Sequence, residues 1–330
     1  MSSLRVALLG YGYAGKTFHA PLIQSCSALS LTHIGSRQGQ VLQQAVGNQI
    51  RVEADISALI SHPHIDIVVI ATPNASHFSL AEAALNAGKH VVVDKPFTLT
   101  FAEATRLCEL AVHNNRLLSV FHNRRYDDDF ITLQQHINTG TYGTVQSLTS
   151  RFDRYRPEVR QRWREQAVPG AGLWYDLGPH LLDQALLLFG EPLRLSGHIQ
   201  IRRIGATVDD EFAITLHYAQ HQVHLQASML QASPTPRFEL QGSKGHWQCL
   251  GLDPQEEQLK AGLTPLAPNW GIRPDAALES GAAVLSRGGY QQYYAQLAAA
   301  IQGEAANPVP ARQAARVMYW LELAKNQLIM

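Results

Sequence analysis

A glycine-rich loop near the N-terminus constrains the fold of this chain more than any other feature. The loop consists of six consecutive residues: Gly10, Tyr11, Gly12, Tyr13, Ala14 and Gly15. It directly follows the apolar run Leu4–Leu9 and opens a helical pattern over Gly15–Ser25. In that setting a G-x-G-x-x-G spacing is typical of dinucleotide binding, because its glycines permit, in order, a tight turn, close approach of the backbone to a pyrophosphate, and close packing of helix on strand. The helix N-terminus would then present free N–H groups to the phosphates. The alternative is an ordinary glycine-rich turn.

Short apolar runs alternate with helical patterns through the first 122 residues. After Leu4–Leu9, strands are expected at Ser30–Ile34, Asp66–Ala71, Lys89–Val93 and Arg116–Phe121. Helices are expected at Gly15–Ser25, Gln38–Val46, Ser76–Ala87 and Phe101–His113. Because apolar, β-branched strands alternate with helices, we expect a parallel sheet that is covered on both faces. Right-handed crossovers then make residues 1–122 a doubly wound Rossmann domain that binds the dinucleotide.

The pattern changes after residue 122. Helices are expected at Tyr126–Ile137, Asp176–Leu188, Tyr290–Gln302 and Pro310–Leu328, and strands at Thr144–Phe152, Glu211–Tyr218 and Gln222–Ser228. Pro157–Gly172 is expected to be a loop, and Leu250–Ser286 a long irregular connection. The alternating runs between residues 193 and 248 predict a large, open, mainly antiparallel sheet.

The second domain, residues 123–330, is therefore expected to be an α/β domain for substrate binding and oligomerisation. Its open sheet would expose an apolar face in a monomer, and such faces usually find a partner. We accordingly expect a homodimer or a homotetramer.

Composition argues against several other classes of protein. The chain has 330 residues, of which 45% are hydrophobic and 16% charged, and this indicates a folded protein of about two domains. The formal net charge is zero, so no nucleic-acid partner is expected. Cys26, Cys108 and Cys249 are far apart and the 15 histidines are scattered, so neither a disulfide framework nor a metal site is expected, and a reducing cytoplasm fits. No apolar stretch is long enough for a membrane span, and Leu4–Leu9 resembles a buried strand rather than a signal peptide.

The end of the second strand bears on the choice of cofactor. An NAD enzyme usually places an acidic residue there, about 20 residues after the glycines, to bind the ribose 2′-hydroxyl. In this chain the strand ends Ile34-Gly35-Ser36-Arg37, without an acid. Ser36 can hydrogen-bond a 2′-phosphate, and Arg37 can supply charge and stack on adenine. We therefore expect NADP rather than NAD; the alternative is a solvated arginine at the start of a helix.

Lys95 follows the strand Lys89–Val93, in the sequence Asp94-Lys95-Pro96. Ligands of doubly wound sheets bind at the carboxyl ends of the strands, so a lysine here would face the nicotinamide end of the crevice. Its ammonium group could hydrogen-bond a substrate hydroxyl and stabilise negative charge on that oxygen, while Pro96 would fix the chain as it leaves the strand. A surface lysine in a strand-helix loop is the alternative.

Asp176 and His180 open the next long helix, four residues apart, so that one helical face carries both. A histidine can take a hydroxyl proton near neutral pH, which suits His180 to the role of general base. Asp176 could bind the substrate hydroxyl or keep the imidazole oriented. The alternatives are that Asp176 caps the helix and His180 is a satisfied core residue, or that the pair is a metal half-site, for which no third ligand is apparent.

Together these motifs resemble the Gfo/Idh/MocA oxidoreductase family over essentially the whole chain. The resemblance depends on GYGYAG at 10–15, ATPNASH at 71–77, DKP at 94–96, HNRRYD at 122–127 and GLWYDLGPH at 172–180. It implies a Rossmann domain, then an α/β domain with an open antiparallel sheet, a tightly bound nicotinamide cofactor, and pyranose or inositol substrates. Asp94 replaces the glutamate of the family's usual Glu-Lys-Pro motif and keeps its carboxylate.

The resemblance also implies roles for individual residues. Lys95 would be catalytic, Asp176 would bind the substrate and His180 would be the general base. The cofactor would be contacted by Thr72, Pro73, Asn74, His77, Asp94, Lys95, Pro96 and Asn123. Arg124 would lie near the nicotinamide or the substrate. The segment FDRYRPEVRQRW resembles the branch that contains NADP-dependent scyllo-inositol dehydrogenases, and it adds as pocket residues Tyr155, Arg156 and Trp163.

The expected reaction is hydride transfer between the nicotinamide and a ring hydroxyl or ketone of a cyclic polyol or sugar. In the oxidation direction His180 takes the hydroxyl proton, Lys95 stabilises the oxygen and Asp176 holds the ring. Two alternatives stay open. The same fold could act on an aldose or another carbonyl compound, or the chain could be a cofactor-bound sensor or regulatory protein without turnover.

Overall fold

The structure of this chain is a computed structural model that describes residues 3–273 and 285–328, and these described residues form two compact units. Unit 1 comprises residues 1–126, 254–271 and 289–315. Unit 2 comprises residues 127–253, 272–288 and 316–330. Unit 1 therefore combines the first part of the sequence with two segments that follow the long stretch 127–253.

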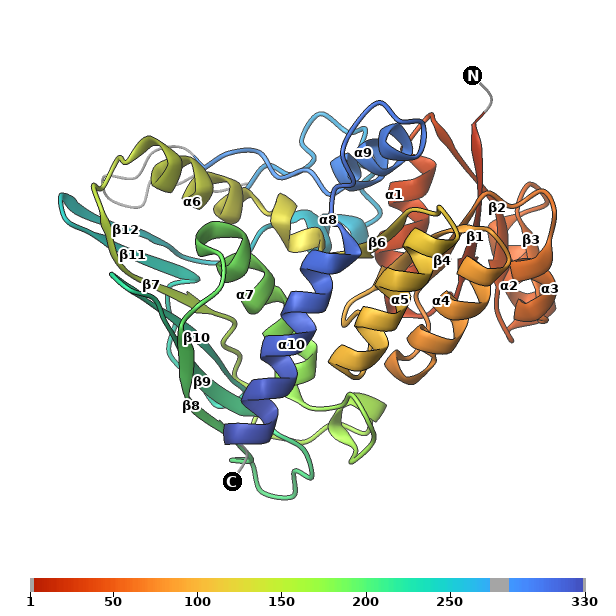
Figure 1. Ribbon diagram of the computed structural model, residues 1–330. Coiled ribbons are helices and arrows are strands. Elements are labelled where there is room, and N and C mark those ends of the chain that lie inside the picture. The colour runs from red at the N-terminus through yellow and green to blue at the C-terminus, as the bar shows by residue number, and fades with distance from the viewer. Residues whose placement is uncertain (1–2, 274–284, 329–330) are drawn as a thin grey trace. The chain divides into compact units, whose positions relative to one another are not determined.

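A parallel sheet with the strand order β3-β2-β1-β4-β5-β6 forms the centre of unit 1 (Figure 1). Its strands are β1 (Leu4–Leu9), β2 (Leu29–Gly35), β3 (Arg51–Glu53), β4 (Ile67–Ile70), β5 (His90–Asp94) and β6 (Leu118–Phe121). Consecutive residues of the central strands are buried, as at Ile67–Ile70, so both faces of the sheet are covered. The strand order reverses between β1 and β4, and the carboxyl ends of strands at such a point are where ligands of this fold bind.

The predicted doubly wound sheet is thus confirmed, and its helices lie close to their expected positions except for a short one at Ile56–Ser61, which was not predicted. They are a π-helical stretch at Gly15–His19 that continues into α1 (Ala20–Gln24), then α2 (Gly39–Val46), α3 (Ile56–Ser61), α4 (His77–Asn86), α5 (Phe101–His113) and α9 (Gln291–Ile301). The blue helix α9 packs beside the red helix α1 in Figure 1, although they come from opposite ends of the chain. A hydrogen bond of 2.6 Å between Tyr294 Oη and His19 Nδ1 joins these two regions.

The expectation that Leu250–Ser286 is wholly irregular was wrong at one place. Residues Gln255–Lys260 form a short helix, α8, which packs on Gly15–His19. The buried Gln255 holds it: its side-chain amide donates to the carbonyl of Tyr126 (3.0 Å) and accepts from the N–H of Tyr290 (2.7 Å). Two turns of helix give too short a pattern to detect by periodicity. Residues 274–284 of this segment lie outside the described residues.

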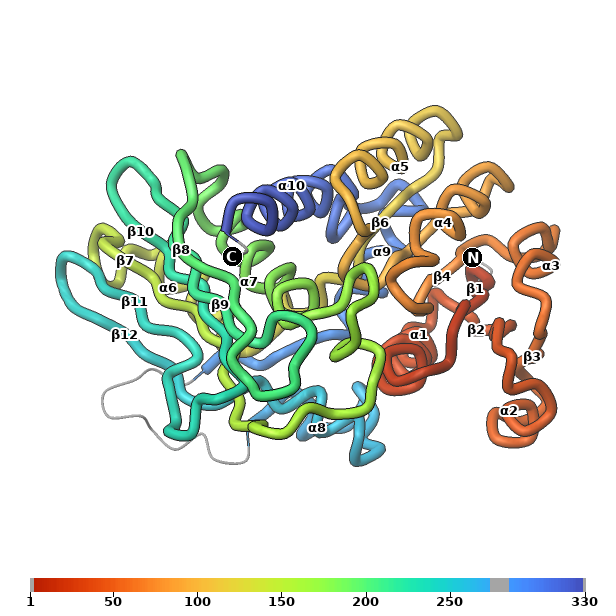
Figure 2. The backbone as a smooth tube through the Cα atoms, turned by 90° about the horizontal axis from the view of Figure 1, so that it is seen from below, coloured from red at the N-terminus to blue at the C-terminus, as the bar shows by residue number. Residues whose placement is uncertain are grey.

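Unit 2 contains a mixed sheet with the strand order β12-β11-β7-β10-β9-β8, whose strands lie side by side in Figure 2. The strands are β7 (Val145–Arg151), β8 (Arg194–Gln200), β9 (Glu211–His217), β10 (Gln222–Ser228), β11 (Phe238–Gly242) and β12 (Gly245–Cys249). β7 pairs parallel with β10, and the other pairs are antiparallel, so the predicted mainly antiparallel sheet is confirmed. The helices are α6 (Asp128–Thr139), α7 (Leu173–Phe189), which packs on β9 and β10, and α10 (Ala311–Leu328), which starts in unit 1 and ends in unit 2.

The outward face of this sheet is polar, which corrects the expectation of an apolar face. Along β9 and β10 the buried inward positions are Phe212, Ile214, Leu216, Val223 and Leu225. The alternate, partly exposed positions include Glu211, Thr215, His217, His224 and Gln226. Period-2 alternation places the polar set on one face, so the argument from an exposed apolar face no longer supports a dimer or tetramer. The oligomeric state stays a prediction, which a solution mass measurement tests.

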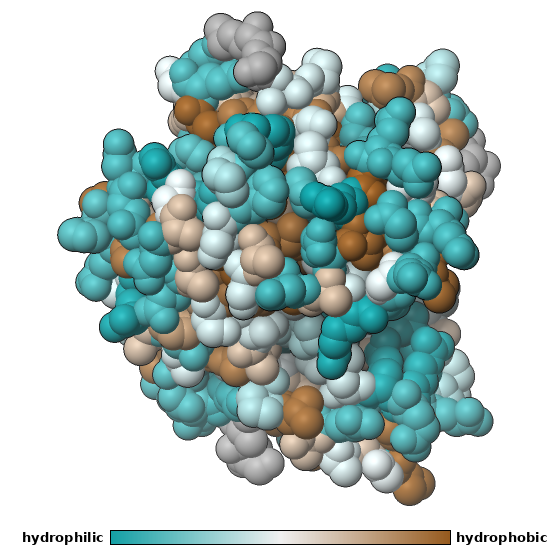
Figure 3. Space-filling view, turned by 90° about the vertical axis from the view of Figure 1, so that its right-hand side faces the viewer, coloured by the Kyte–Doolittle hydropathy of each residue, from teal (hydrophilic) through white to brown (hydrophobic). Residues whose placement is uncertain are grey.

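In the residues that the structure describes, no helix is long and apolar enough to cross a membrane. The face shown in Figure 3 is mostly hydrophilic, with apolar side chains scattered in small groups.

Candidate active site

The packing of the chain itself requires glycine at two positions of the phosphate loop. Gly10 has a φ of 94°, and a Cβ there would lie 2.5 Å from the carbonyl oxygen of Ala71. A Cβ on Gly15 would lie 2.2 Å from the carbonyl oxygen of Gly10. The N–H of Gly10 donates to the carbonyl of Gly35 at the end of β2 (2.9 Å), which ties the turn to the sheet. A side chain at Gly10 or Gly15 would therefore force the turn apart.

Gly12 differs from these two glycines, because no described part of the protein requires glycine there. Its φ is outside the left-handed region, and a Cβ there would meet no atom of residues 3–273 or 285–328 within 4 Å. Gly12 is exposed at the point where the helix begins, and its carbonyl accepts from the N–H of Lys16 (2.9 Å). The open space beside its Cα is the space that a pyrophosphate needs for close contact with this backbone. The loop therefore fits a dinucleotide, and Gly10, Gly12 and Gly15 have distinct reasons to be glycine.

Ser36 and Arg37 follow β2, at the same edge of the sheet as the phosphate loop. The Ser36 N–H donates to the carbonyl of Glu53 (2.9 Å), and its Oγ accepts from the N–H of Gln38 (3.2 Å), so its hydroxyl proton remains available to a ligand. Arg37 is exposed, and its side chain makes no hydrogen bond or ion pair with any residue in 3–273 or 285–328. Both side chains are thus free to bind an anionic group on a cofactor.

His77 links the two turns that follow β4 and β5. Its side chain is 1% exposed; Nδ1 lies 2.8 Å from the carbonyl oxygen of Pro96, and Nε2 lies 2.9 Å from that of Thr72. Burial lowers the pKa of His77, although Asp94 and these carbonyls act to raise it. Since both ring nitrogens contact the protein backbone, His77 fixes the distance between the Thr72-Pro73-Asn74 turn and the Asp94-Lys95-Pro96 turn.

Asp94 holds the backbone from which the half-buried Lys95 extends. Its Oδ1 accepts from the N–H of Lys95 (2.8 Å) and lies 3.9 Å from Nε2 of His19, which is completely buried. Burial raises the pKa of Asp94, but His19, Lys95 and His77 outweigh it and hold that pKa below its ordinary value. Asp94 is therefore a carboxylate at neutral pH, and its negative charge attracts the ammonium group of Lys95.

Glu256, in α8, is a residue of this region that the sequence did not point to. Its Oε1 accepts from the hydroxyl of Tyr13 (2.5 Å), and its Oε2 lies 3.1 Å from Nη2 of the buried Arg124. Although burial acts to raise it, the pKa of Glu256 is lowered by Arg124, by Tyr13 and by Lys260, whose Nζ is 3.2 Å away. Glu256 thus joins the phosphate loop to the segment after β6 through an ionised carboxylate.

Asp176 and His180 lie one turn apart on α7 in unit 2, as their spacing predicts. The helix begins three residues earlier than expected, because Asp209 caps it: the carbonyl of Asp209 accepts from the N–H of Leu173 (2.8 Å) and its Oδ2 from that of Trp174 (2.6 Å). Asp176 is therefore not the capping residue, and it lies within the first turn. His180 is 5% exposed, and Asp176 is more accessible at 19% of its side chain.

Asp176 also lines a partly open hollow in unit 2. The charged side chains around it, besides Asp176, are Arg162, Arg164, Glu165, Arg203, Asp209 and Asp210. Nε of Arg164 lies 3.6 Å from Oδ1 of Asp176, and its guanidinium stacks over the ring of Trp163 at 4.7 Å. Tyr155 is 60% exposed, and its backbone forms an isolated bridge with Leu230.

The predicted site residues thus fall into two groups, one on each unit. Unit 1 holds the residues predicted for the cofactor at the carboxyl ends of β1, β2, β4, β5 and β6, including the buried Asn74 and Asn123, together with Lys95 and Arg124. Unit 2 holds Asp176 and His180 on α7 and, in the segment after β7, Tyr155, Arg156 and Trp163.

Asp209 should make stability depend on pH. Burial, with a contribution from Asp210, raises its pKa from 3.8 to about 6, although the Trp174 N–H and Lys325 act against this. The folded chain then binds the Asp209 proton more tightly than the unfolded chain, so this contribution is complete below about pH 4 and is lost as the pH rises through about 6. Relative to Asp209→Asn, the free energy of unfolding of the wild type should fall by on the order of 2 kcal/mol between pH 4 and pH 7.

Chemical denaturation of both proteins at several pH values measures this difference. The comparison cancels other titrating groups, including the buried Asp129, because both proteins contain them. A difference between the two proteins that does not change with pH would show that Asp209 titrates as an ordinary exposed carboxyl.

Known proteins of similar sequence cover both units. Residues 4–122 match the Gfo/Idh/MocA oxidoreductase family with its NAD-binding Rossmann fold, and residues 130–248 match a Gfo/Idh/MocA C-terminal domain. The uncharacterized oxidoreductase YdgJ of Escherichia coli is 45% identical over 97% of this chain and 95% of its own length. The scyllo-inositol 2-dehydrogenase (NADP(+)) IolW of Bacillus subtilis is 33% identical over 98% of this chain and 93% of its own. The crystal structure of a protein from Klebsiella pneumoniae superimposes with a TM-score of 0.91 at 47% identity, covering 98% of this chain and 93% of that one.

Proposed function

This chain belongs to the Gfo/Idh/MocA oxidoreductase family, and we propose that it transfers a hydride between NADP(H) and a ring hydroxyl or ketone of a cyclic polyol or sugar such as scyllo-inositol. The observation that carries the proposal is in unit 1. Lys95 follows β5 at the same edge of the sheet where the phosphate loop, with open space beside Gly12, follows β1. A lysine beside a dinucleotide loop suits chemistry at an alcohol or carbonyl oxygen. The name of the Bacillus subtilis relative supports the choice of NADP and of an inositol.

The roles that we propose for the side chains follow from their chemistry. The bound nicotinamide would supply or accept the hydride. Lys95 would donate a hydrogen bond to the substrate oxygen and stabilise its negative charge, with its backbone held by Asp94. His180 would take the hydroxyl proton during oxidation and return it during reduction, and Asp176 would bind a neighbouring hydroxyl.

The proposal is tested by following NADP+ reduction with the purified protein over a panel of inositols and aldoses. Turnover of an inositol in preference to every aldose would support it. Turnover of aldoses alone would favour the alternative substrate class. Tight NADPH binding without turnover of any compound would favour a sensor or regulatory protein, against which the presence of Lys95, Asp176 and His180 together argues.

Arg37 should control the choice between the two nicotinamide cofactors. The side chain has no partner among the described residues and lies next to Ser36, so a 2′-phosphate is the anion that it would bind. Arg37→Ala should lower kcat/KM for NADP+ by roughly tenfold or more and change that for NAD+ little, since a hydrogen bond to a charged group contributes about 1.5–3 kcal/mol. Steady-state kinetics with each cofactor measure both values. A wild type that prefers NAD+, or an equal loss with both cofactors, would contradict the assignment.

A further inference from the structure

We propose that the segment 156–165 of unit 2 binds an oxyanion of the substrate through the guanidinium groups of Arg156 and Arg160, so that the substrate is a polyol or sugar bearing a carboxylate or a phosphate. This inference rests on the proposed function and narrows its substrate class from neutral polyols such as scyllo-inositol to acidic derivatives of polyols or sugars. Residues 151–164 contain six arginines and only two acidic residues. The contacts of these residues show which of the arginines are structural and which are not.

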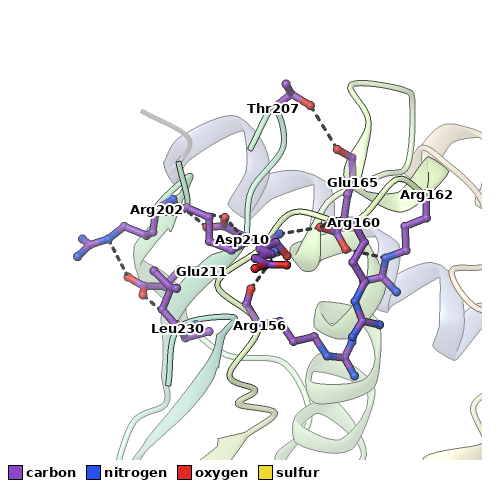
Figure 4. A network of polar contacts seen from close by, with 12 residues as sticks. Arg156, Arg160, Arg162, Glu165, Arg202, Thr207, Asp210, Glu211 and Leu230 are labelled. Carbon is purple, nitrogen blue, oxygen red and sulfur yellow. Dashed lines mark hydrogen bonds and ion pairs between the residues drawn. The ribbon is translucent and has the colours of Figure 1, made fainter. Parts of the chain in front are cut away.

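A buried arginine fixes the shape of this segment. Arg203 is 5% exposed; its Nε lies 2.9 Å from Oδ2 of Asp210 and its Nη2 lies 3.1 Å from Oε2 of Glu165. Its Nη1 donates to the backbone carbonyls of Arg156 (3.2 Å) and Glu158 (3.1 Å). One guanidinium thereby holds two carboxylates and two carbonyls, and Figure 4 shows this network around Asp210 and Glu165.

Both carboxylate oxygens of Glu165 also have partners within this network. Its Oε2 accepts from the backbone N–H of Arg160 (2.9 Å), and its Oε1 accepts from Nε of Arg162 (2.7 Å). The pKa of Glu165 is lowered, because these hydrogen bonds and the charges of Arg162 and Arg203 outweigh its burial. The acidic groups at the centre of the network are thus neutralised by Arg203 and Arg162.

In the described part of the chain, no acidic side chain is bonded to the guanidinium of Arg156 or Arg160. The network holds the backbone of both residues through Glu165 and Arg203. No hydrogen bond or ion pair of either guanidinium is present among residues 3–273 and 285–328. Arg156 is half-buried, and its pKa is lowered by that burial and by the charges of Arg154, Arg160 and Arg162, which outweigh the opposing charge of Glu165. In Figure 4 the side chains of Arg156, Arg160 and Arg162 extend toward the same region.

Like charges held together on one segment repel one another, and a bound anion would relieve that repulsion. A guanidinium is planar and binds carboxylate or phosphate oxygens through paired N–H donors, which a neutral hydroxyl cannot match. The same segment reaches the hollow that Asp176 lines, because Arg162 and Arg164 form part of its wall. Asp176 suits a hydroxyl. Arg156 and Arg160 do not line the hollow themselves, but they belong to the segment that reaches it, and their guanidinium groups suit an acidic substituent.

The experiment compares the full-length wild type with Arg156→Gln, Arg160→Gln and the double variant. Arg202→Gln is the matched control, because Arg202 is an exposed arginine of the same unit that pairs with Glu211 at 4.0 Å. Calorimetric titration with inorganic phosphate and, separately, with NADP+ measures binding without turnover. Steady-state kinetics with two matched pairs, glucuronate against glucose and an inositol monophosphate against inositol, measure the preference for an acidic substrate and distinguish carboxylate from phosphate.

We expect kcat/KM to favour the acidic member of at least one pair, and each substitution to lower that preference and the phosphate affinity by roughly tenfold. Arg202→Gln should behave as the wild type. Equal phosphate binding and equal substrate ratios in wild type and double variant would overturn the proposal, and so would a loss of NADP+ affinity as large as the loss of phosphate affinity, because the anion would then be the cofactor's own phosphate. Arginine-dependent phosphate binding without turnover of any polyol would refute the proposed function and leave the oxyanion site standing.

Discussion

Replacing His180 with alanine is expected to lower kcat by about 10²–10⁴-fold while changing the affinity for NADPH little. The size of the effect follows from the role proposed for the imidazole, which is to move the hydroxyl proton during hydride transfer. The fold explains why kcat should fall while the affinity for NADPH changes little. His180 lies on α7 of unit 2, whereas the phosphate loop and the turns after β2, β4 and β5 all belong to unit 1. Steady-state kinetics give kcat, and quenching of protein fluorescence by NADPH gives the affinity.

Two further variants show whether a loss of activity comes from chemistry or from folding. His180 is buried, so alanine leaves a cavity; His180→Gln fills most of that volume without a group that titrates near neutral pH. Leu187→Ala changes an exposed side chain on the same helix and should leave kcat unchanged. A fall in NADPH affinity equal to the fall in kcat, in a variant that unfolds like the wild type, would argue against a role as base.

The sequence predicts those parts of this fold in which every level of structure agrees. Ile67–Ile70 is apolar, β-branched and completely buried, so its pattern and its environment match. β3 (Arg51–Glu53) and α3 (Ile56–Ser61) were not predicted, because three residues with an exposed arginine and six residues after an Asp55 cap are too short to show a period. The prediction of an apolar outward face for the second sheet was wrong for a different reason. Apolar and polar residues alternate along β9 and β10, but that prediction took only the apolar residues into account.

The candidate site likewise contains residues that the sequence predicts and residues that it does not. The spacing of Asp176 and His180 is local, and the structure reproduces it on α7. Glu256 contacts Tyr13 from 243 residues further along the chain, and it lies in a segment without periodicity. The capping of α7 by Asp209 and the buried pairing of Arg203 with Glu165 depend likewise on contacts between distant segments. Nothing in the residues next to these side chains signals such contacts, so only the folded chain reveals them.

Gly12 provides the largest expected effect on cofactor binding. Gly12→Ala is expected to weaken NADPH binding by roughly 10- to 100-fold, since filling a close-packed contact with a methyl group costs about 1–3 kcal/mol. The free protein should be as stable as the wild type or slightly more stable. The new Cβ meets no atom of the described residues within 4 Å, and alanine restricts the unfolded chain by about 0.4–1 kcal/mol relative to glycine. Calorimetric titration measures the affinity, and chemical denaturation without cofactor measures the stability.

Gly15→Ala is the matched comparison, because its Cβ would lie 2.2 Å from the carbonyl oxygen of Gly10. We expect that variant to lose stability in the absence of any ligand, whereas Gly12→Ala loses only cofactor affinity. The two glycines lie three residues apart in one motif, so opposite behaviour would separate the packing of the loop from its contact with the cofactor. Wild-type NADPH affinity in Gly12→Ala would place the pyrophosphate elsewhere. A loss of stability equal to that of Gly15→Ala would mean that the space beside Gly12 is filled by the protein itself.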